Sequence, residues 1–458
     1  MRKKFAIMAL ALVIALVIGA CGQSPTTTTK PNVTTTGQSE TISPSGTENV
    51  MQFPTEDLTL TYIWWGNQVR HERTQKVVSM FTEQHPNITI EVEFPATAEY
   101  NDKLLTLIST GKTPDMFQTE YEYIPQWATG NVAQSFQPYI DAGIIDLTDC
   151  TSLDACKFKG ELYAHNLGLN GPSIMYDINL LKDLGIEINP NEPWTWDDFL
   201  RIGKEVYDKS GVKTSLWITF KPTDWIRCSA RNEKSTLFFD NTKLGFTDPM
   251  IVKRVYDIFE KAVADGFAVP ADFYASYSSV EQQAIVTGEA WNACLTSNMI
   301  IGLQNAIGAD RPIGYKMIPD FAGAQQPGQY LKPSQVICMS KTSTDTEKIV
   351  AASYINFMVS DISANKVLLG ERGVPCNSKV IEAIKGDVDQ TAQRMFEFIA
   401  TATKYAPPLE TDECTFVQEL SEYSKILAES VWNKLDTSQS ATDKFFAKTD
   451  ELISEVKK

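Results

Sequence analysis

The apolar and polar positions of the chain follow strand and helix patterns from residue 58 onward. Residues 58–65 predict a strand with apolar side chains on both faces, which is typical of a strand that helices cover on both sides. A Gly66-Asn67 turn leads into a predicted helix whose first two turns are polar. The apolar residues of that helix are concentrated in its second half, at Val77, Val78, Met80 and Phe81.

Two tryptophans end this strand and face the polar start of the helix. One interpretation is a ligand site, because ligands gather beyond the carboxyl ends of strands and a helix start carries partial positive charge. The other is that Trp64 and Trp65 belong to the core and that the polar turns are only solvated. Trp64 shares its strand face with Leu60 and Tyr62, whereas Trp65 is the last residue before Gly66, so Trp65 is the stronger candidate for a ligand platform.

The next elements predict a parallel sheet. Residues 88–94 alternate apolar and polar as a strand does, residues 100–109 give a helix, and residues 114–118 give another strand. A β-α-β-α-β order places helices on the faces of a parallel sheet. Glu120 and Tyr121 follow the last of these strands, so we expect them at the same edge of the sheet as the two tryptophans.

Glycine breaks in the pattern indicate two lobes. The strand-like residues 162–177 are interrupted by glycine at 168 and 171, and we expect the chain to cross between lobes near 168–172, 312–316 and 370–376. The predicted fold class is α/β, with one lobe from residues 57–168 plus 316–372 and the other from 169–315 plus 373–458, each a sheet flanked by helices. Further predicted elements are a helix capped by Thr195, a helix opened by Asp248-Pro249, strands at 288–298, 313–319 and 335–339, a helix at 347–358 and mostly helix after 379.

Residues 1–20 have the pattern of a secretion leader. A basic start precedes an uninterrupted apolar run at residues 5–18, which is shorter than the ~20 residues that a membrane span needs. The segment Ile18-Gly19-Ala20-Cys21 resembles the bacterial lipobox, which implies that Cys21 is the lipidated first residue of the mature chain. Ordinary secretion, with cleavage after Ala20 and an unmodified thiol, is the alternative.

Residues 21–56 form a tether rich in threonine, serine and proline, with too little apolar surface to fold. A flexible tether of about 30 residues reaches about 30 Å root-mean-square, enough to hold a globule just off a membrane. Lipid, tether and globule together predict a protein on the outer face of the bacterial cytoplasmic membrane, attached to it through the lipid anchor only.

Composition narrows the range of partners. The 458 residues include 57 acidic against 41 basic side chains, three of the basic ones in the leader. No basic run follows the leader, so nucleic acid is not an expected partner. The seven cysteines after Cys21 show no metal-type spacing, and only Cys150 and Cys156 are near enough in the sequence to suggest a disulfide. We therefore expect neither a metal nor a cofactor.

A set of short motifs occurs in order along the chain. They are the lipobox and tether, the Trp-Trp-Gly strand end, PDMFQTEY, LNGPSIMYDINLLKDLGIEINPNEPWTWDDF, GEAWNACLTSN and GERGVPCN, of which PWTWDDF is the most specific. In order and spacing they resemble the extracellular solute-binding proteins (family 1) of carbohydrate ABC importers, from about Leu58 to the C-terminus. The resemblance implies a two-lobed periplasmic-binding-protein (Venus flytrap) fold with three hinge segments, similar to the maltose-binding protein.

The resemblance also implies a sugar site between the lobes. A sugar presents CH-rich ring faces and a fringe of hydroxyls, which aromatic planes and paired polar groups recognise. Relatives often carry an aromatic residue near Ser297, where this chain has none, so Trp291 is either a substitute or a core residue. Arg70 has the alternative of pairing with Glu72 or Glu83. The candidate ligand-binding residues are Trp64, Trp65, Arg70, Glu120, Tyr121, Asn170, Trp225, Trp291, Asn298, Tyr330 and Arg372.

The predicted function is capture of a sugar, in particular an oligosaccharide, by closure of the lobes and its delivery to the permease of an ABC transporter, with a monomer as the expected state. No enzyme is predicted, because the three histidines are scattered, Gly-x-Ser-x-Gly is missing and His71-Glu72 lacks the second histidine of a zincin. Three alternatives are open: a lipid-anchored glycosidase or lyase, since carboxylate separation is not readable from sequence, a surface adhesin, and the same fold with a polyol or another polar solute as ligand.

Overall fold

The computed structural model describes residues 51–456, apart from residues 67, 217–221, 241, 275–278, 410–413 and 415. The predicted leader, the lipidated Cys21 and nearly all of the tether lie outside the described residues. Within this part of the chain, no helix is both long enough and apolar enough to cross a membrane.

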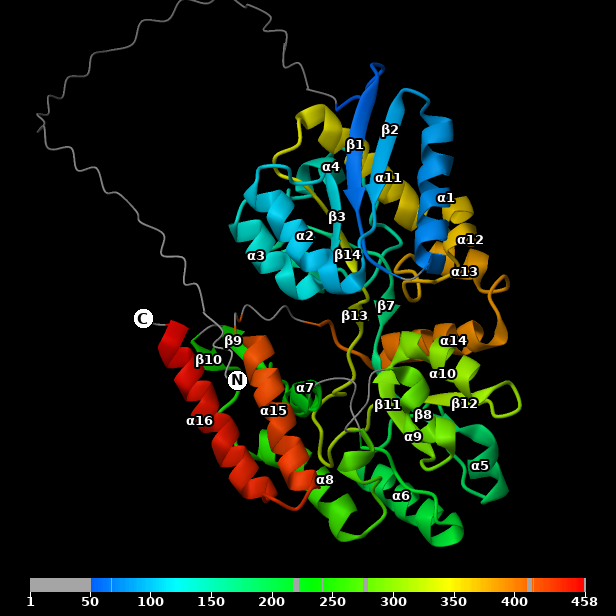
Figure 1. Cartoon of the computed structure of the whole chain (residues 1–458), viewed down its shortest axis with the longest axis vertical. Helices are drawn as coiled ribbons and strands as arrows, with labels where there is room; N and C mark the ends of the chain where they lie inside the picture. Colours follow the sequence, from blue (N-terminus) through cyan, green and yellow to red (C-terminus); the bar gives the residue numbers. More distant parts are fainter. Residues whose placement is uncertain are drawn as a thin grey trace, which may run out of the picture. The chain divides into compact units, whose positions relative to one another are not determined.

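Five strands form the first sheet, in the order β2-β1-β3-β14-β6, and Figure 1 labels β2, β1, β3 and β14. β1 (Leu58–Ile63) lies parallel to β2 (Ile88–Glu93) and to β3 (Met116–Thr119). β14 (Val336–Met339) is antiparallel to β3 and to β6 (His165–Asn166). α1 (Gln68–Gln84) and α2 (Thr97–Ser109) connect the first three strands, which confirms the predicted β-α-β-α-β order.

Three antiparallel strands form the second sheet, in the order β11-β8-β12. The middle strand, β8 (Pro172–Asp177), is buried at all six positions. β11 (Asn292–Thr296) and β12 (Ile313–Met317) are both shorter than the strands that the sequence predicted. β11 ends where a 3₁₀ helix, η5 (Ser297–Met299), begins.

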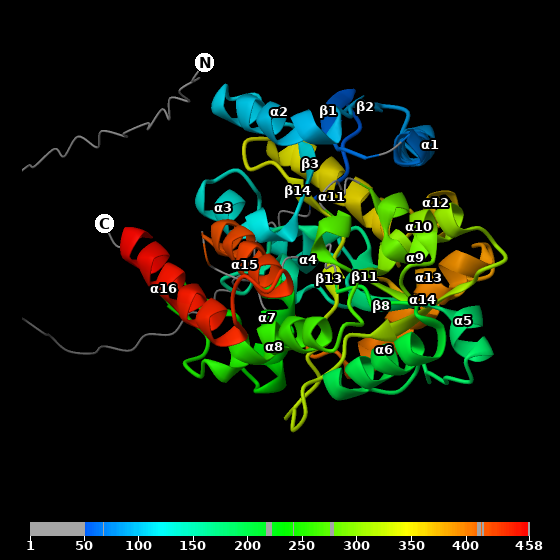
Figure 2. The ribbon, with the colours of Figure 1, turned by 60° about the horizontal axis from the view of Figure 1, so that its bottom comes forward.

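Helices pack on both sheets. α11 (Asp345–Ser360) contacts β1 and β14, and α12 (Ile362–Leu368) packs against α1. α14 (Gln390–Tyr405) packs on β12, and α10 (Ile300–Ile307) packs on α14. A further group of four helices packs together: α7 (Pro222–Asn232), α8 (Met250–Ala264), α15 (Val417–Trp432) and α16 (Ser438–Val456). Figures 1 and 2 both show α15 and α16 side by side.

The helix starts predicted from local chemistry are confirmed. Thr195 caps α6 (Trp196–Ser210): its hydroxyl accepts from the backbone N–H of Asp198, and the Asp198 carboxylate accepts from the N–H of Thr195. The Asp248 carboxylate accepts from the backbone N–H of Met250, 2.9 Å away, at the first turn of α8.

Three segments run side by side between the sheets. β7 (Leu169–Asn170) pairs with β13 (Lys332–Pro333) on one side, and Leu169 exchanges two backbone hydrogen bonds with Val374 on the other. The crossings predicted near 168–172 and 370–376 are therefore at the expected places. The crossing predicted near 312–316 is wrong, because those residues pair with β8 inside the second sheet, and β13 is the segment that lies beside β7. The lobe boundaries themselves stay a prediction.

The remaining elements are short. They are η1 (Tyr121–Tyr123), α3 (Ile124–Thr129), α4 (Gln137–Asp141), η2 (Asp154–Cys156), β4 (Lys157–Phe158), β5 (Glu161–Leu162), α5 (Ile178–Asp183), β9 (Phe238–Asp240), β10 (Lys243–Leu244), η3 (Ala271–Tyr274), η4 (Val280–Gln282), α9 (Ala284–Thr287) and α13 (Ser378–Ile384).

Candidate ligand-binding site

The carboxyl ends of β1 and β3 meet at Trp65. Its backbone carbonyl accepts hydrogen bonds from Gln118 Nε2 at 3.2 Å and from Arg70 Nη1 at 3.3 Å. The indole ring lies 4.6 Å from the ring of Tyr100, centroid to centroid, and the side chain is only half-buried. Trp65 thus combines a fixed position with an accessible aromatic surface, which is what a ligand platform requires.

Arg70 reaches across the strand end from the first turn of α1. Its Nε donates to both carboxylate oxygens of Glu371, at 2.8 and 3.1 Å. The sequence had offered Glu72 or Glu83 as partners, and the structure pairs Arg70 with a residue 301 positions away instead. A Cβ on Gly66 would stand 2.2 Å from Arg70 Cδ, so a glycine at this turn leaves the space that the side chain occupies.

Arg372 lies beneath the same strand ends. Its Nε donates to Gln118 Oε1 at 3.2 Å, and its Nη1 is 3.8 Å from Glu371 Oε2. Burial lowers the pKa of the Arg372 guanidinium, and its two terminal nitrogens have no hydrogen-bond partner among the described residues. The residue is 4% exposed, so in this structure Arg372 contacts Gln118 of β3 from the protein interior and presents almost no surface to a ligand.

Tyr121, Asn170 and Lys332 gather where the crossing segments meet the end of β3. Lys332 is paired with Asn170 in the β7–β13 register, and its ammonium lies 5.9 Å from the centroid of the Tyr121 ring. Asn170 Oδ1 accepts from the hydroxyl of Ser297, which brings in the start of η5 at 3.4 Å. Glu120, the residue before Tyr121, is exposed.

Tyr330 lies close to this group through α7. Its hydroxyl donates to Asp224 Oδ1 at 3.0 Å, and the Arg227 guanidinium is 6.0 Å from the centroid of its ring. Burial and the Asp224 carboxylate raise the pKa of the Tyr330 hydroxyl, with a smaller contribution from Tyr121. Tyr330 therefore links α7 to the neighbourhood of Tyr121.

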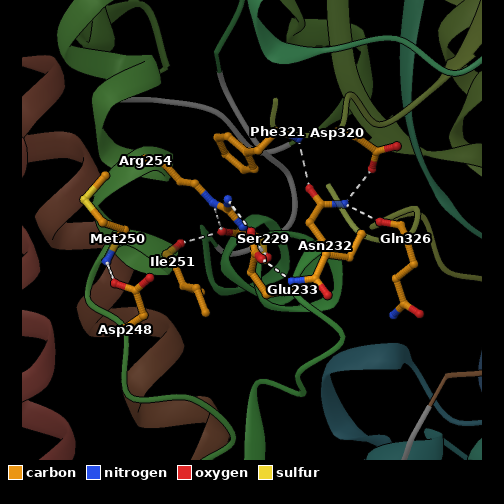
Figure 3. Close-up of polar contacts among 11 residues, drawn as sticks. Ser229, Asn232, Glu233, Asp248, Met250, Ile251, Arg254, Asp320, Phe321 and Gln326 are labelled. Atoms are coloured by element: carbon orange, nitrogen blue, oxygen red, sulfur yellow. Dashed lines mark hydrogen bonds and ion pairs between the residues drawn. The ribbon is translucent and has the colours of Figure 1, made fainter. Parts of the chain in front are cut away.

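A buried polar network holds α7 against the loop that leads to Tyr330 (Figure 3). The side-chain amide of Asn232 donates to Asp320 Oδ1 and to the Gln326 carbonyl, and its oxygen accepts from the backbone N–H of Phe321. Beside it, Arg254 donates to Ser229, forms an ion pair with Glu233 at 2.9 Å and stacks over Phe321. The contacts of Asn232 and Arg254 thus help to hold Tyr330 next to Asp224.

Three predicted tryptophans lie in the core instead of at a ligand surface. Trp64 is fully buried between Tyr62 and Phe94. Trp225 packs against Trp196 at 4.4 Å, and the indole N–H of Trp291 donates to Thr214 Oγ1 at 2.9 Å. Their exposed fractions are 0–1%, so in this structure protein atoms cover the indole rings and leave no ring face for a sugar.

The structure places Trp65, Arg70 and Arg372 around Gln118 and Glu371, and it places Tyr121 and Asn170 around Lys332. Tyr330 contacts Asp224, and Glu120 is exposed. Asn298 is half-buried in η5 next to Ser297, and its Oδ1 has no hydrogen-bond partner among the described residues. Ligand contact by these residues stays a prediction. The sequence analysis did not predict five residues of this region: Gln118, Asp224, Arg227, Lys332 and Glu371. Each lies within three positions of a predicted site residue, so the polar neighbours of each candidate could have indicated them.

The contact between Trp64 and His71 gives a prediction on pH. The indole N–H can only donate, so His71 Nδ1 accepts it at 3.1 Å, and burial, with Arg70 and Arg372 nearby, lowers the pKa of His71. We expect the free energy of unfolding to be highest above about pH 6.5, the ordinary histidine pKa, and to fall as the pH drops toward the lowered folded-state value.

Urea midpoints between about pH 8 and pH 5 measure this. His71→Asn keeps an acceptor but has no titrating ring, so its midpoint should fall less with pH than that of the unchanged protein. His85, whose pKa burial also lowers, supplies part of the remaining slope. An unchanged slope in His71→Asn would contradict the assignment.

Solved structures share this fold. An extracellular solute-binding protein of family 1 from Alicyclobacillus acidocaldarius has a TM-score of 0.73 to this chain at 22% identity, over 87% of this chain and 99% of that one. A de novo designed cysteine esterase has a TM-score of 0.74 at 18% identity, over 88% of this chain and 100% of that one. The likeness shows the two-lobed α/β fold of periplasmic solute-binding proteins, as the sequence predicted.

Sequence comparisons identify the family. The model of the bacterial extracellular solute-binding proteins matches residues 76–395, so the chain belongs to that family. A lactose-binding protein from Rhizobium radiobacter is 25% identical over 214 residues, and an arabinooligosaccharide-binding protein from Bacillus subtilis is 22% identical over 227 residues. Each match covers 45% of this chain and 50% or 48% of the relative, so the chain spans about half the length of these curated relatives.

Proposed function

We propose that the protein captures a sugar, in particular an oligosaccharide, between its two lobes and delivers it to the permease of an ABC importer. The observation that carries the proposal is Trp65, a half-buried indole fixed at the end of β1. Polar groups that suit sugar hydroxyls lie beside it at Arg70 and Gln118, and others lie where the crossing segments meet the end of β3, at Asn170 and Lys332. The names of the relatives, lactose-binding and arabinooligosaccharide-binding, support a sugar ligand.

The chemistry of the region fits a sugar. An indole face covers the CH groups of a pyranose, while carboxylates, amides and guanidinium groups form paired hydrogen bonds with its hydroxyls. Each hydrogen bond contributes about 0.5–1.5 kcal/mol net, so micromolar affinity, about −8 kcal/mol, requires several bonds together with stacking. We propose the carboxylates of Glu120 and Asp224 and the side-chain oxygen of Asn298 as acceptors for some of these hydrogen bonds.

Binding by lobe closure needs a hinge, and the three crossing segments supply it. Their backbones approach closely: a Cβ on Gly168 would stand 2.6 Å from the Arg372 carbonyl oxygen, and one on Gly373 would stand 2.7 Å from the Leu169 carbonyl oxygen. Closure shifts the equilibrium only as far as a ligand binds the closed form more tightly. We propose that the permease recognises the closed form.

The site of action follows from the N-terminal sequence. The leader, the lipobox ending in Cys21 and the threonine-rich tether support a lipoprotein on the outer face of the cytoplasmic membrane, which we propose acts as a monomer. The lipid is proposed as its only attachment to the membrane, and the permease as its protein partner. A glycosidase or lyase, an adhesin, or a binding protein for another polar solute are the outcomes that would replace the proposal.

A panel of oligosaccharides in a thermal-shift experiment tests the proposal. Ligand at 100 times its Kd adds about 2.7 kcal/mol to the free energy of unfolding, so a true ligand raises Tm measurably. Trp65→Ala should abolish this shift and leave the Tm without ligand nearly unchanged. Tyr423→Ala, which removes another half-buried aromatic ring on α15, should keep the full shift.

Two controls separate the alternatives. The sugar recovered after incubation should be intact, whereas cleavage products would indicate a glycosidase or lyase. A Tm for unliganded Trp65→Ala far below that of Tyr423→Ala would show that Trp65 is a core residue. No shift across the panel would favour the adhesin, and a shift with polyols alone would keep the fold and change the ligand.

A further inference from the structure

Two cysteines and a histidine from three separate segments meet in a cluster that contains none of the candidate sugar-binding residues. Cys150 follows α4, His165 lies in β6, and Cys376 follows the last crossing segment. The two sulfur atoms and a ring nitrogen of His165 all lie within 4.8 Å of one another, with Cys150 Sγ 3.9 Å from His165 Nε2. The sequence had suggested a Cys150–Cys156 disulfide, but Cys150 is not joined to Cys156 and faces Cys376 instead.

The orientation of His165 suits a metal ligand. Its Nδ1 lies 3.0 Å from the carbonyl oxygen of Asn166, and because a carbonyl can only accept, Nδ1 carries the hydrogen. The lone pair of Nε2 is thereby directed toward the Cys150 sulfur. Metal-binding histidines in proteins commonly donate their second ring N–H to a backbone carbonyl in this way, which fixes the tautomer and the ring plane.

The groups around Cys150 hold the cluster together. The Cys376 sulfur and a ring nitrogen of His165 lie within 4.8 Å of Cys150 Sγ. The Asn377 side-chain amide lies 3.9 Å from Cys150 Sγ, while its oxygen caps α13 and so holds the amide in place. Cys376 is 3% exposed and His165 is 0% exposed, whereas Cys150 is half-buried and leaves one side accessible to water.

We propose that Cys150, His165 and Cys376 form a binding site for a thiophilic divalent cation, with Zn²⁺ as the probe and water in the fourth coordination position. Two thiolates and one imidazole around a site with one open position are a donor set that zinc accepts. The site goes beyond sugar capture and does not depend on it.

The cation would join the end of the last crossing segment, at Cys376, to the segment around Cys150 and to β6. Residues 149–151 and 376–378 already form a short antiparallel pair, through Thr151 N–H to the Cys376 carbonyl and Ser378 N–H to the Asp149 carbonyl. A metal that joins the two cysteines adds a cross-link between the same segments. Because binding occurs only in the folded state, it raises the stability of that state.

The test is Zn²⁺ titration of the full chain with its thiols reduced, against a chromophoric chelator. We expect one Zn²⁺ per chain and a rise in Tm on its addition. Cys150→Ser and Cys376→Ala should each weaken Zn²⁺ binding at least about 100-fold, the upper end of the loss caused by removing an outer-shell partner. Cys414→Ser, which removes a half-buried cysteine outside the cluster, should bind Zn²⁺ as the unchanged chain does.

Co²⁺ gives a readout on the unchanged chain that requires no variant to fold. Tetrahedral Co²⁺ bound through two thiolates should show ligand-field bands and a thiolate charge-transfer band, and Zn²⁺ should displace it. No stoichiometric Zn²⁺ binding, or equal binding by all variants, would overturn the proposal. So would a Cys150–Cys376 disulfide, detected as linked peptides after alkylation without reductant, in protein that takes up no Zn²⁺.

Discussion

Replacement of Glu371 by glutamine is expected to lower the free energy of unfolding by about 3–5 kcal/mol, the cost of removing one partner from a buried ion pair. The Glu371 side chain is 8% exposed, and it faces Arg70 at 2.8 Å and Arg372 at 3.8 Å, whose side chains are 10% and 3% exposed. Glutamine keeps the shape of the side chain but removes the only negative charge that these contacts give the two guanidinium groups.

The effect should extend to ligand binding. Arg70 also donates to the Trp65 carbonyl, so release of its Nε from Glu371 loosens the strand end that carries the proposed platform. We expect Glu371→Gln to bind the sugar found in the panel more weakly even at temperatures where it is fully folded. Isothermal calorimetry and urea unfolding measure the two effects separately.

Glu382→Gln is the matched control. Glu382 pairs with Lys385 at 2.5 Å, but these side chains are 69% and 55% exposed, so solvent screens the pair. Exposed pairs contribute about 0–1 kcal/mol, and we expect Glu382→Gln to change neither stability nor affinity by more than that. Equal losses in Glu371→Gln and Glu382→Gln would contradict the account of Glu371 as a buried counter-ion.

The sequence predicted the three parallel strands of the first sheet well because these strands and the helices between them are contiguous in the chain. The period-2 and period-3.6 patterns between residues 58 and 118 each describe one complete strand or helix, and the order of elements then determines the parallel pairing. The cap of α6 and the Asp248 contact at the start of α8 were predicted for the same reason, since the groups that form each of them lie within three residues of one another.

The crossings between the lobes were harder to predict, because an apolar run that forms a strand inside a sheet looks the same in the sequence as one that passes from one lobe to the other. Residues 312–316 were expected to pass between lobes, yet Ile313–Met317 is buried at every position and pairs with β8. The true neighbour of β7 is a two-residue strand, Lys332–Pro333, which is too short to give a periodic signal. Only the fold shows that it lies between the sheets.

The candidate site was predicted only in part, since a tryptophan looks the same in a core and at a ligand surface. Strand parity separated buried Trp64 from half-buried Trp65, the two residues that directly follow β1. Trp225 and Trp291 had no such local marker, and their aromatic and threonine partners lie 29 and 77 positions away in the chain. The Cys150–His165–Cys376 cluster and the Arg70–Glu371 pair are likewise products of tertiary contact, with separations of up to 301 residues.

Asn232→Ala is expected to lower the free energy of unfolding by about 3 kcal/mol, because it removes three buried hydrogen bonds worth about 0.5–1.5 kcal/mol each and leaves Asp320 without one of its donors. Asn232 is 0% exposed and is bonded to Asp320, to the Gln326 carbonyl and to the Phe321 N–H. Burial raises the pKa of Asp320, and the Asn232 amide is one of the groups that oppose this.

The loop anchored by Asn232 also leads directly to Tyr330, so the same change should weaken sugar binding although Asn232 is remote from the proposed platform. Gly328 sits so close to α7 that a Cβ there would stand 2.6 Å from the Cys228 carbonyl oxygen, so the loop packs tightly against the helix that carries its anchor. Asn433→Ala removes an exposed asparagine bonded only to the Glu429 carbonyl among the contacts described, and it should alter stability by less than about 0.5 kcal/mol. If Asn232→Ala lowers Tm but binds the sugar with unchanged affinity, the Tyr330–Asp224 contact does not form part of the ligand site, and the site is confined to the strand ends of the first sheet and the crossing segments.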